Sequence, residues 1–165
     1  MTSEADAIGA FTETTDYPLL VITTIADGDD RSGCLAGFVT QCSIDPPRFL
    51  VCISRANHTF NVAQRARYLV LHLLGERQAD LASRFGERTG DKVDKFADVR
   101  WHPGPEGVPV LDECAAWVLV EIVARFDVGD HQAMLTAPLD GGAGNQSGLL
   151  TYCNAPPLDA GHPAT

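Results

Sequence analysis

The amino-acid sequence predicts a mainly β domain, a closed or nearly closed antiparallel barrel with one or two short helices. Apolar segments rich in β-branched residues recur along the chain, Gly, Pro and Asp turn signals separate them, and no alternating strand–helix pattern is present. The 165 residues, 45% of them hydrophobic, suffice for one continuous core and are few for two. We therefore expect one domain over residues 16–155, a polar, loosely docked arm at 1–15 and a disordered tail at 156–165.

The first half of the chain is expected to form three strands. Residues 19–25 are rich in β-branched side chains and end at the turn signal Asp27-Gly28-Asp29-Asp30. Residues 33–43 supply the return strand, which ends at Asp45-Pro46-Pro47 because proline lacks the N–H that a ladder needs. Residues 49–54 are apolar enough to be buried on both faces of the sheet.

Two short helices follow. Residues 60–66 predict a helix that Asn57 or Thr59 can cap. Residues 77–85 place apolar side chains at helical spacing and end at Gly86, a typical helix stop.

The remaining strands lie on either side of these helices and toward the end of the chain. Residues 68–74 form one of them. The longest candidate is 116–127, and its better core face consists of Val118, Val120, Ile122 and Phe126. A turn at Gly129-Asp130 leads to a strand over 131–136, and residues 149–152 form a last short strand.

The charge balance excludes several classes of partner. The chain carries 12 basic and 22 acidic side chains, and the resulting net charge of −10 repels nucleic-acid phosphates and anionic membrane surfaces. Its apolar runs are far shorter than the roughly 20 residues needed to cross a bilayer, and the start MTSEADAIGA lacks the basic region of a signal peptide. We expect a soluble cytoplasmic protein that binds neither nucleic acid nor membrane.

The cysteines and histidines predict neither disulfides nor a metal site. The five cysteines are an odd set without a C-x-x-C pair, and most lie in apolar segments, which is typical of reduced, buried thiols. No two histidines have ligand spacing beside a cysteine or carboxylate, so we expect no metal. His72 lies in an apolar strand and is expected to be a core or interface histidine with satisfied hydrogen bonds.

Several segments, taken in order, carry a resemblance to a known family. The chain reads VITTIADGDDRSGCLAGFVTQCSIDPP, then FLVCIS with NHT behind it, then DKVDKFA, GVPVL and FDVGDH. With these segments it resembles the flavin reductase family built on the FMN-binding split barrel, over about residues 17–152. The resemblance implies a homodimer of six-stranded antiparallel Greek-key barrels that binds FMN or FAD. It also implies a hydride donor, NADH or NADPH, and a separate monooxygenase that often receives the reduced flavin.

The resemblance also assigns cofactor-binding positions. Gln41, Cys42 and Ser43 match the position that holds the isoalloxazine edge, largely through backbone groups. On this interpretation the break at Asp45-Pro46-Pro47 leaves the polar groups of residues 40–43 unpaired for the ligand. The full set of assigned positions is Gly33, Ala36, Gly37, Gln41, Cys42, Ser43, Ser54, Asn57, His58, Thr59, Phe85, Lys95 and Phe96.

Two groups of these positions have a plain structural alternative. Ser54, Asn57 and Thr59 match the phosphate-binding turn, which also contains His58, and groups at a helix N-terminus can hold an anion without a net positive protein. An ordinary helix cap is the alternative. The segment DKVDKF at 91–96 matches a region that the family packs near the flavin or the partner subunit, and the alternative is a solvated charged turn.

His131 is the candidate catalytic residue. In the family the histidine of Gly-Asp-His lies by the nicotinamide side of the flavin, where it can hydrogen-bond or help to place the bound cofactor. The alternative is a histidine that merely opens a strand at the barrel rim. We expect no general base, because hydride transfer between stacked cofactors needs little acid–base help.

The sequence leaves the flavin and the role of the barrel open. The family commonly has Thr and Asn where this chain has Leu35 and Gly37, so the ligand is FMN, FAD or a deazaflavin such as F420. No arginine clamp for a 2′-phosphate distinguishes NADPH from NADH. Two further hypotheses are a non-catalytic flavin-binding or carrier barrel and an acidic barrel that serves as an interaction module.

Overall fold

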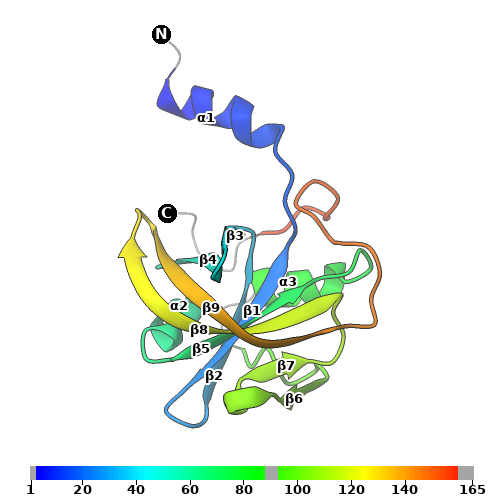
Figure 1. The fold of residues 1–165 in the computed structure, drawn as a ribbon. Helices are drawn as coiled ribbons and strands as arrows, with labels where there is room; N and C mark the ends of the chain where they lie inside the picture. Colours follow the sequence, from blue (N-terminus) through cyan, green and yellow to red (C-terminus); the bar gives the residue numbers. More distant parts are fainter. Residues whose placement is uncertain (1–2, 88–92, 160–165) are drawn as a thin grey trace.

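Antiparallel strands make up most of the fold (Figure 1). The structure, a computed structural model, describes residues 3–87 and 93–159. Within these residues the large sheet contains β1 (Leu20–Ala26), β2 (Asp30–Ala36), β3 (Val39–Ile44), β4 (Pro47–Ser54), β5 (Tyr68–Leu73), β8 (Ala116–Asp127) and β9 (His131–Ala143). A small sheet contains β6 (Trp101–Pro103) and β7 (Pro109–Leu111). The helices are α1 (Glu4–Glu13), α2 (His58–Ala63), α3 (Ala79–Glu87) and the 3-10 helix η1 (Pro105–Gly107).

The predicted mainly β, antiparallel class is confirmed. The large sheet has the order β2-β1-β5-β8-β9-β4-β3, and each neighbouring pair is antiparallel. The pairs β1–β2, β3–β4 and β8–β9 are hairpins, whereas β1–β5 and β4–β9 join strands far apart in the sequence, as Greek-key connections do. The N–H of Cys52 donates to the carbonyl oxygen of Phe38 at 2.9 Å, which ties the β2–β3 connection to β4.

The large sheet has seven strands in the described residues, where the resemblance implied six. The segment 33–43, expected as one return strand, forms the end of β2 and most of β3, with a break at Gly37 and Phe38. At Gly37 a Cβ atom would lie 2.3 Å from the ring of Tyr17, so the backbone passes directly against that ring. The break therefore follows from a close approach that only glycine permits.

The proline pair acts differently from the prediction. Asp45 and Pro46 form the turn between β3 and β4, and β4 begins at Pro47. Thr40, Gln41 and Ser43 pair with β4, and Cys42 lies at the register shift between Gln41 and Ser43. The expectation that residues 40–43 stay unpaired was therefore wrong for Thr40, Gln41 and Ser43, because the proline turn closes a hairpin instead of ending the sheet.

The two largest apolar clusters form most of the core. One fills the barrel between strands and contains Leu20, Ile22, Cys34, Val51, Ile53, Ala63, Leu69, Leu71, Val120 and Met134. The other lies under α3 and contains Leu19, Val21, Leu74, Ala82, Phe85, Phe96, Leu111 and Leu150. Burial on both faces was wrong for β4, where Val51 and Ile53 are buried and their neighbours are partly covered.

The expected core face of β8 is correct only at its start. Val120 is buried, Val118 and Ile122 are half-buried, and Phe126 is 51% exposed. The reason is the pairing: β5 covers β8 only as far as Glu121, and beyond that point β8 pairs with β9 alone.

The helices and chain ends show further differences. Asn57 caps α2, where its Oδ1 accepts the N–H of Thr59 at 3.0 Å, and α3 extends to Glu87, one residue past the predicted stop. The described part of the expected loose arm forms α1, which begins with a capping box at Ser3 and Asp6, has no buried residue and extends away from the barrel (Figure 1). Among the described residues no helix is long and apolar enough to cross a membrane.

Candidate functional site

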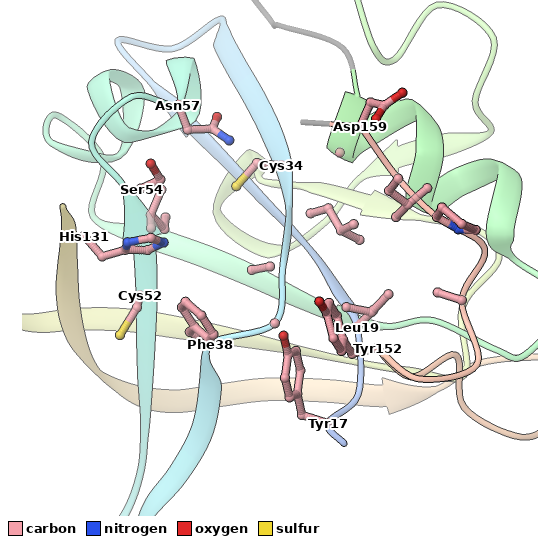
Figure 2. A pocket seen from close by; sticks show the side chains of 18 of the residues that line it. Tyr17, Leu19, Cys34, Phe38, Cys52, Ser54, Asn57, His131, Tyr152 and Asp159 are labelled. Atoms are coloured by element: carbon pink, nitrogen blue, oxygen red, sulfur yellow. The ribbon is translucent and has the colours of Figure 1, made fainter. Parts of the chain in front are cut away.

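A cavity of about 830 Å³ lies where β2 reaches the β2–β3 connection (Figure 2). One wall is formed by the last residues of β2, Cys34, Leu35 and Ala36, and by Gly37, which follows the strand. Ends of β4 and β9 form a second wall, and the chain segment at 155–159 forms a third. Residues 156–159, which belong to the tail predicted to be disordered, line this cavity.

Five of the predicted site residues line the cavity. They are Ala36, Gly37, Ser54, Asn57 and His131. Ser54 and His131 are direct partners in the β4–β9 ladder, so pairing of these strands places both at one wall. In Figure 2 Ser54, Asn57 and His131 follow one side of the cavity, opposite Asp159.

The other predicted positions lie outside the cavity lining. The three residues Gln41, Cys42 and Ser43 are on β3, which forms an antiparallel hairpin with β4. His58 opens α2, and Thr59 is buried with its hydroxyl 2.9 Å from that of Ser32. The remaining four lie in β2 or behind it, and they are Gly33, Phe85, Lys95 and Phe96. Lys92 lies outside the described residues.

His131 is held by its neighbour in the sequence. Its Nδ1 lies 2.7 Å from the Asp130 carboxylate, and because a carboxylate only accepts, the Nδ1–H donates and Nε2 remains as an acceptor. Its ring is 5.4 Å from the Phe38 ring at a tilt of 55°. The side chain is 26% exposed, so a ligand in the cavity can reach it.

Aromatic side chains that the sequence analysis missed continue this wall. The rings of Tyr17 and Tyr152 stack at 5.0 Å, and Tyr17 lies 6.1 Å from Phe38. All three line the cavity and form, with His131, a row of rings. Burial raises the pKa of Tyr17 above its usual value.

The two tyrosines meet because the two ends of the domain are hydrogen-bonded to each other. The N–H of Leu19 donates to the carbonyl oxygen of Leu150, and that of Tyr152 to the carbonyl oxygen of Tyr17, both at 2.9 Å. The N–H of Cys153 donates to Asp16 at 2.9 Å. A sequence reading has no local signal for such pairing, since the partners lie at opposite ends of the domain.

The tail is attached to the barrel at a second point. Leu158 packs against the cluster under α3. The N–H of Asp159 donates to Glu87 Oε1 at 3.0 Å, at the end of α3. Residues 155–159, here named the strap, therefore close the side of the cavity that faces α3.

Comparison with known proteins identifies the family. Residues 12–155 match the model described as the flavin reductase like domain. The chain belongs to this family. The resemblance drawn from the sequence is thus confirmed, and the strap residues 156–159 lie beyond the matched segment.

Two curated relatives of this flavin reductase-like chain are longer than the segment that it matches. FMN reductase (NADH) RutF of Methylorubrum extorquens is 35% identical over 133 residues, which are 80% of this chain and 63% of that protein. Stachydrine N-demethylase reductase subunit Stc3 of Rhizobium meliloti is 30% identical over 134 residues, 79% of this chain and 54% of that protein. The chain thus spans about half to three fifths of these relatives.

Solved structures share the fold. The flavin reductase domain protein of Arthrobacter sp. FB24 superimposes with a TM-score of 0.79 at 26% identity, over 92% of this chain and 98% of that one. The NADH:FAD oxidoreductase SgcE6 of Streptomyces globisporus superimposes with a TM-score of 0.78 at 20% identity, over 87% and 86% of the two chains.

The thiols of this flavin reductase-like domain are all free, as predicted, but not all buried. Cys42 and Cys153 are exposed, while Cys34 and Cys114 are buried. Three of the thiols, those of Cys34, Cys52 and Cys153, line the cavity. Burial raises the pKa of Cys34 to about 11 and also raises that of Cys52, so these two thiols stay protonated and uncharged near pH 7.

The cavity has the features that a flavin ring requires. Within the described sheet β2 pairs only with β1, so its other edge presents backbone N–H and C=O groups along the cavity. Those groups suit the alternating donors and acceptors of a heteroaromatic ring, and the small side chain of Ala36 adds little bulk to this wall. The described lining contains no Lys or Arg, and its charged residues are Asp130 and Asp159.

Proposed function

We propose that this chain is an NAD(P)H-dependent flavin reductase that reduces FMN or FAD. The observation that carries the proposal is the cavity at the free edge of β2, which combines the unpaired backbone edge of that strand with a row of aromatic rings beside His131. Family membership supports the same reaction class. A relative named FMN reductase (NADH) and one named probable flavin reductase agree with it.

The residues of the chain bind and orient the reactants. The free edge of β2 offers hydrogen bonds to the flavin ring, and Ser54 and Asn57 offer neutral polar groups for the chain attached to it. A bound flavin would supply the hydride acceptor. With both cofactors bound, the dihydronicotinamide would give up one hydride and become NAD(P)⁺, and a proton from solvent would balance the two-electron reduction of the flavin.

His131 is the proposed positioning group for the nicotinamide. Asp130 fixes its ring, and Nε2 can accept a hydrogen bond from the carboxamide of the nicotinamide. The Phe38 ring next to it offers an apolar surface for a flat ligand. No proton has to be removed for hydride transfer, so the described side chains need only hold the reactants in contact.

The proposal includes a partner and an assembly state. Reductase subunits or components of monooxygenases among the relatives support delivery of reduced flavin to a separate monooxygenase. A homodimer is supported by the exposed apolar side chains of Ile44, Val123 and Phe126, because large apolar surface on a folded chain favours association. A cytoplasmic location is supported by the free cysteines.

The test is aerobic oxidation of NADH and NADPH by the purified chain, with and without FMN, FAD and F420, while its absorption spectrum is recorded. Saturable oxidation with FMN or FAD is the expected result, and oxidation with F420 alone would assign a deazaflavin oxidoreductase. A yellow protein that oxidises neither nicotinamide would indicate a flavin carrier. A colourless, inactive protein would contradict the proposal.

A matched pair of histidines tests the site. His131 and His102 each place Nδ1 2.7 Å from an aspartate, but of the two only His131 lines the cavity. We expect His131→Ala to lower kcat/KM for NADH about tenfold, equivalent to one lost hydrogen bond to the substrate. His102→Ala should leave it unchanged, and an equal effect of both variants would remove His131 from the site.

A further inference from the structure

Lys95 is a buried lysine placed behind the wall of the cavity. It is 3% exposed, and its Nζ donates to the carbonyl oxygen of Gly33 at 3.0 Å and to that of Phe85 at 2.9 Å. Each acceptor immediately precedes a residue that lines the cavity, Cys34 in β2 and Gly86 in α3. The ammonium group therefore joins two backbone segments of the wall, although Lys95 itself does not line the cavity.

The surroundings of Nζ favour a cation. Its two partners are carbonyl oxygens, which only accept hydrogen bonds. Phe85 belongs to the last turn of α3, where the negative end of the helix dipole lies. The Phe85 ring lies 5.9 Å from Nζ, and the face of an aromatic ring also attracts positive charge.

Among the described residues no carboxylate forms an ion pair with Lys95, whereas the arginines nearby in sequence and space do pair. Arg31 pairs with Asp94, and Arg84 with Asp98. Burial lowers the pKa of Lys95, which reflects the cost of holding its charge away from water. A buried charge without a carboxylate can be offset by an anionic ligand nearby.

The edge of β2 connects this charge to the ligand site. Gly33 can accept from Lys95 because its carbonyl points away from β1, toward the free edge of the sheet. Backbone groups of alternate residues share a direction along a strand, so Leu35 presents its groups to the same edge within the cavity wall. Lys95 thus occupies the beginning of the row of backbone groups that a ring in the cavity would meet.

We infer that Lys95 is an electrostatic positioning residue, whose charge favours the reduced, more negative flavin over the oxidised form. The inference rests on the proposed function, in which the hydride adds one negative charge to the flavin before a proton follows. Lys95 acts through the wall and has no contact with the ligand in this arrangement. The charged residues in the described lining of the cavity are acidic, and Lys95 supplies a positive charge close to it.

The test compares the affinity of the full-length protein for oxidised and for dithionite-reduced FMN, the latter measured anaerobically. The unmodified protein is expected to bind the reduced form more tightly. Lys95→Met, of similar length and without charge, should weaken binding of reduced FMN about tenfold more than that of oxidised FMN. Such a change lowers the two-electron potential of bound FMN by about 30 mV.

Three variants separate charge from packing. Lys95→Arg keeps the charge and should keep most of the preference for reduced over oxidised FMN. Lys95→Gln keeps a hydrogen-bond donor without the charge and should lose that preference. Arg67→Met removes one exposed positive charge outside the cavity lining and should change neither affinity.

Each outcome decides between the proposals. If Lys95→Met, Lys95→Gln and the unmodified chain all show the same preference for reduced over oxidised FMN, the inference is overturned and the flavin reductase assignment stays intact. If the uncharged variants do not fold, an unmodified protein that prefers oxidised FMN would overturn it equally. Failure to bind either form would instead contradict the proposed function.

Discussion

His72 shows how one buried side chain ties three strands together. It is fully buried, its Nδ1–H donates to the carbonyl oxygen of Val21 at 3.0 Å, and its Nε2 accepts the N–H of Leu111 at 3.0 Å. Both nitrogens are therefore used by the neutral ring, which links β5 to β1 and β7. The prediction of a core histidine with satisfied hydrogen bonds is confirmed.

This arrangement makes stability depend on pH. Burial lowers the pKa of His72 from 6.5 to about 4, so below pH 6.5 the unfolded chain takes up a proton that the folded chain refuses. The contribution of neutral His72 to the free energy of unfolding is fully present above pH 6.5. It is lost as the pH falls toward 4, by about 3 kcal/mol in total. Urea unfolding at pH 7.5 and 4.5 measures the loss.

The control for this prediction is a variant without the imidazole. His72→Asn should be less stable at pH 7.5, because Leu111 loses its acceptor. Between pH 7.5 and 4.5 the unfolding free energy of this variant should fall less than that of the unmodified chain. The difference between the two falls should be nearly the full His72 contribution. An equal loss in both proteins would mean that His72 is not the titrating group.

At the scale of elements, the strap is a wall of the cavity that lies, apart from Ala155, beyond the family match. Leu158 anchors it in the apolar cluster under α3, and Asp159 reaches Glu87. Leu158→Asp would place a charge in that cluster and should release the strap from the barrel. We expect the dissociation constant for FMN to rise about tenfold, measured by quenching of flavin fluorescence, because one wall of the site is lost.

Leu139 offers the matched control. It is 53% exposed on β9 and does not line the cavity, so Leu139→Asp adds the same charge without moving the strap. FMN affinity should be unchanged in that variant. If Leu158→Asp also binds FMN as tightly as the unmodified chain, the strap is a covering that the ligand does not need.

The elements also show what could be predicted from the sequence. β1, β5 and β8 were found because their β-branched and apolar side chains must pack on a half-buried sheet. Asn57 was found because cap geometry is local. The row of Tyr17 and Tyr152 was missed, since long-range pairing of the chain ends creates it.

The features of the candidate site that depend on neighbouring residues could be predicted from the sequence better than those that depend on contacts between distant segments. His131 lines the cavity at the strand end that the turn signal Gly129-Asp130 had located, whereas the break after Ala36 fell inside a segment expected as one strand. Lys95 and Phe96 were expected near the ligand, yet they are buried behind β2. Which side of a strand a loop packs on depends on tertiary contacts that periodicity does not contain.

The charge of the whole molecule governs how its ligands approach. The chain carries −10, and FMN and NADH are themselves anions. Like charges slow diffusional encounter, and salt weakens this repulsion because the Debye length falls from about 30 Å at 0.01 M to about 10 Å at 0.1 M ionic strength. Salt should therefore speed the binding of FMN, the opposite of its effect on a site that attracts anions.

Riboflavin allows this prediction to be tested on the same cavity, because it has the ring of FMN without the phosphate. With NADH held saturating, kcat/KM for FMN should rise roughly threefold between 0.01 and 0.1 M NaCl, whereas that for riboflavin should stay constant. A fall for FMN alone would show that a local positive group outweighs the net charge during approach. Lys95 is not expected to act in this way, since it is buried behind the wall and influences the ligand only once it is bound.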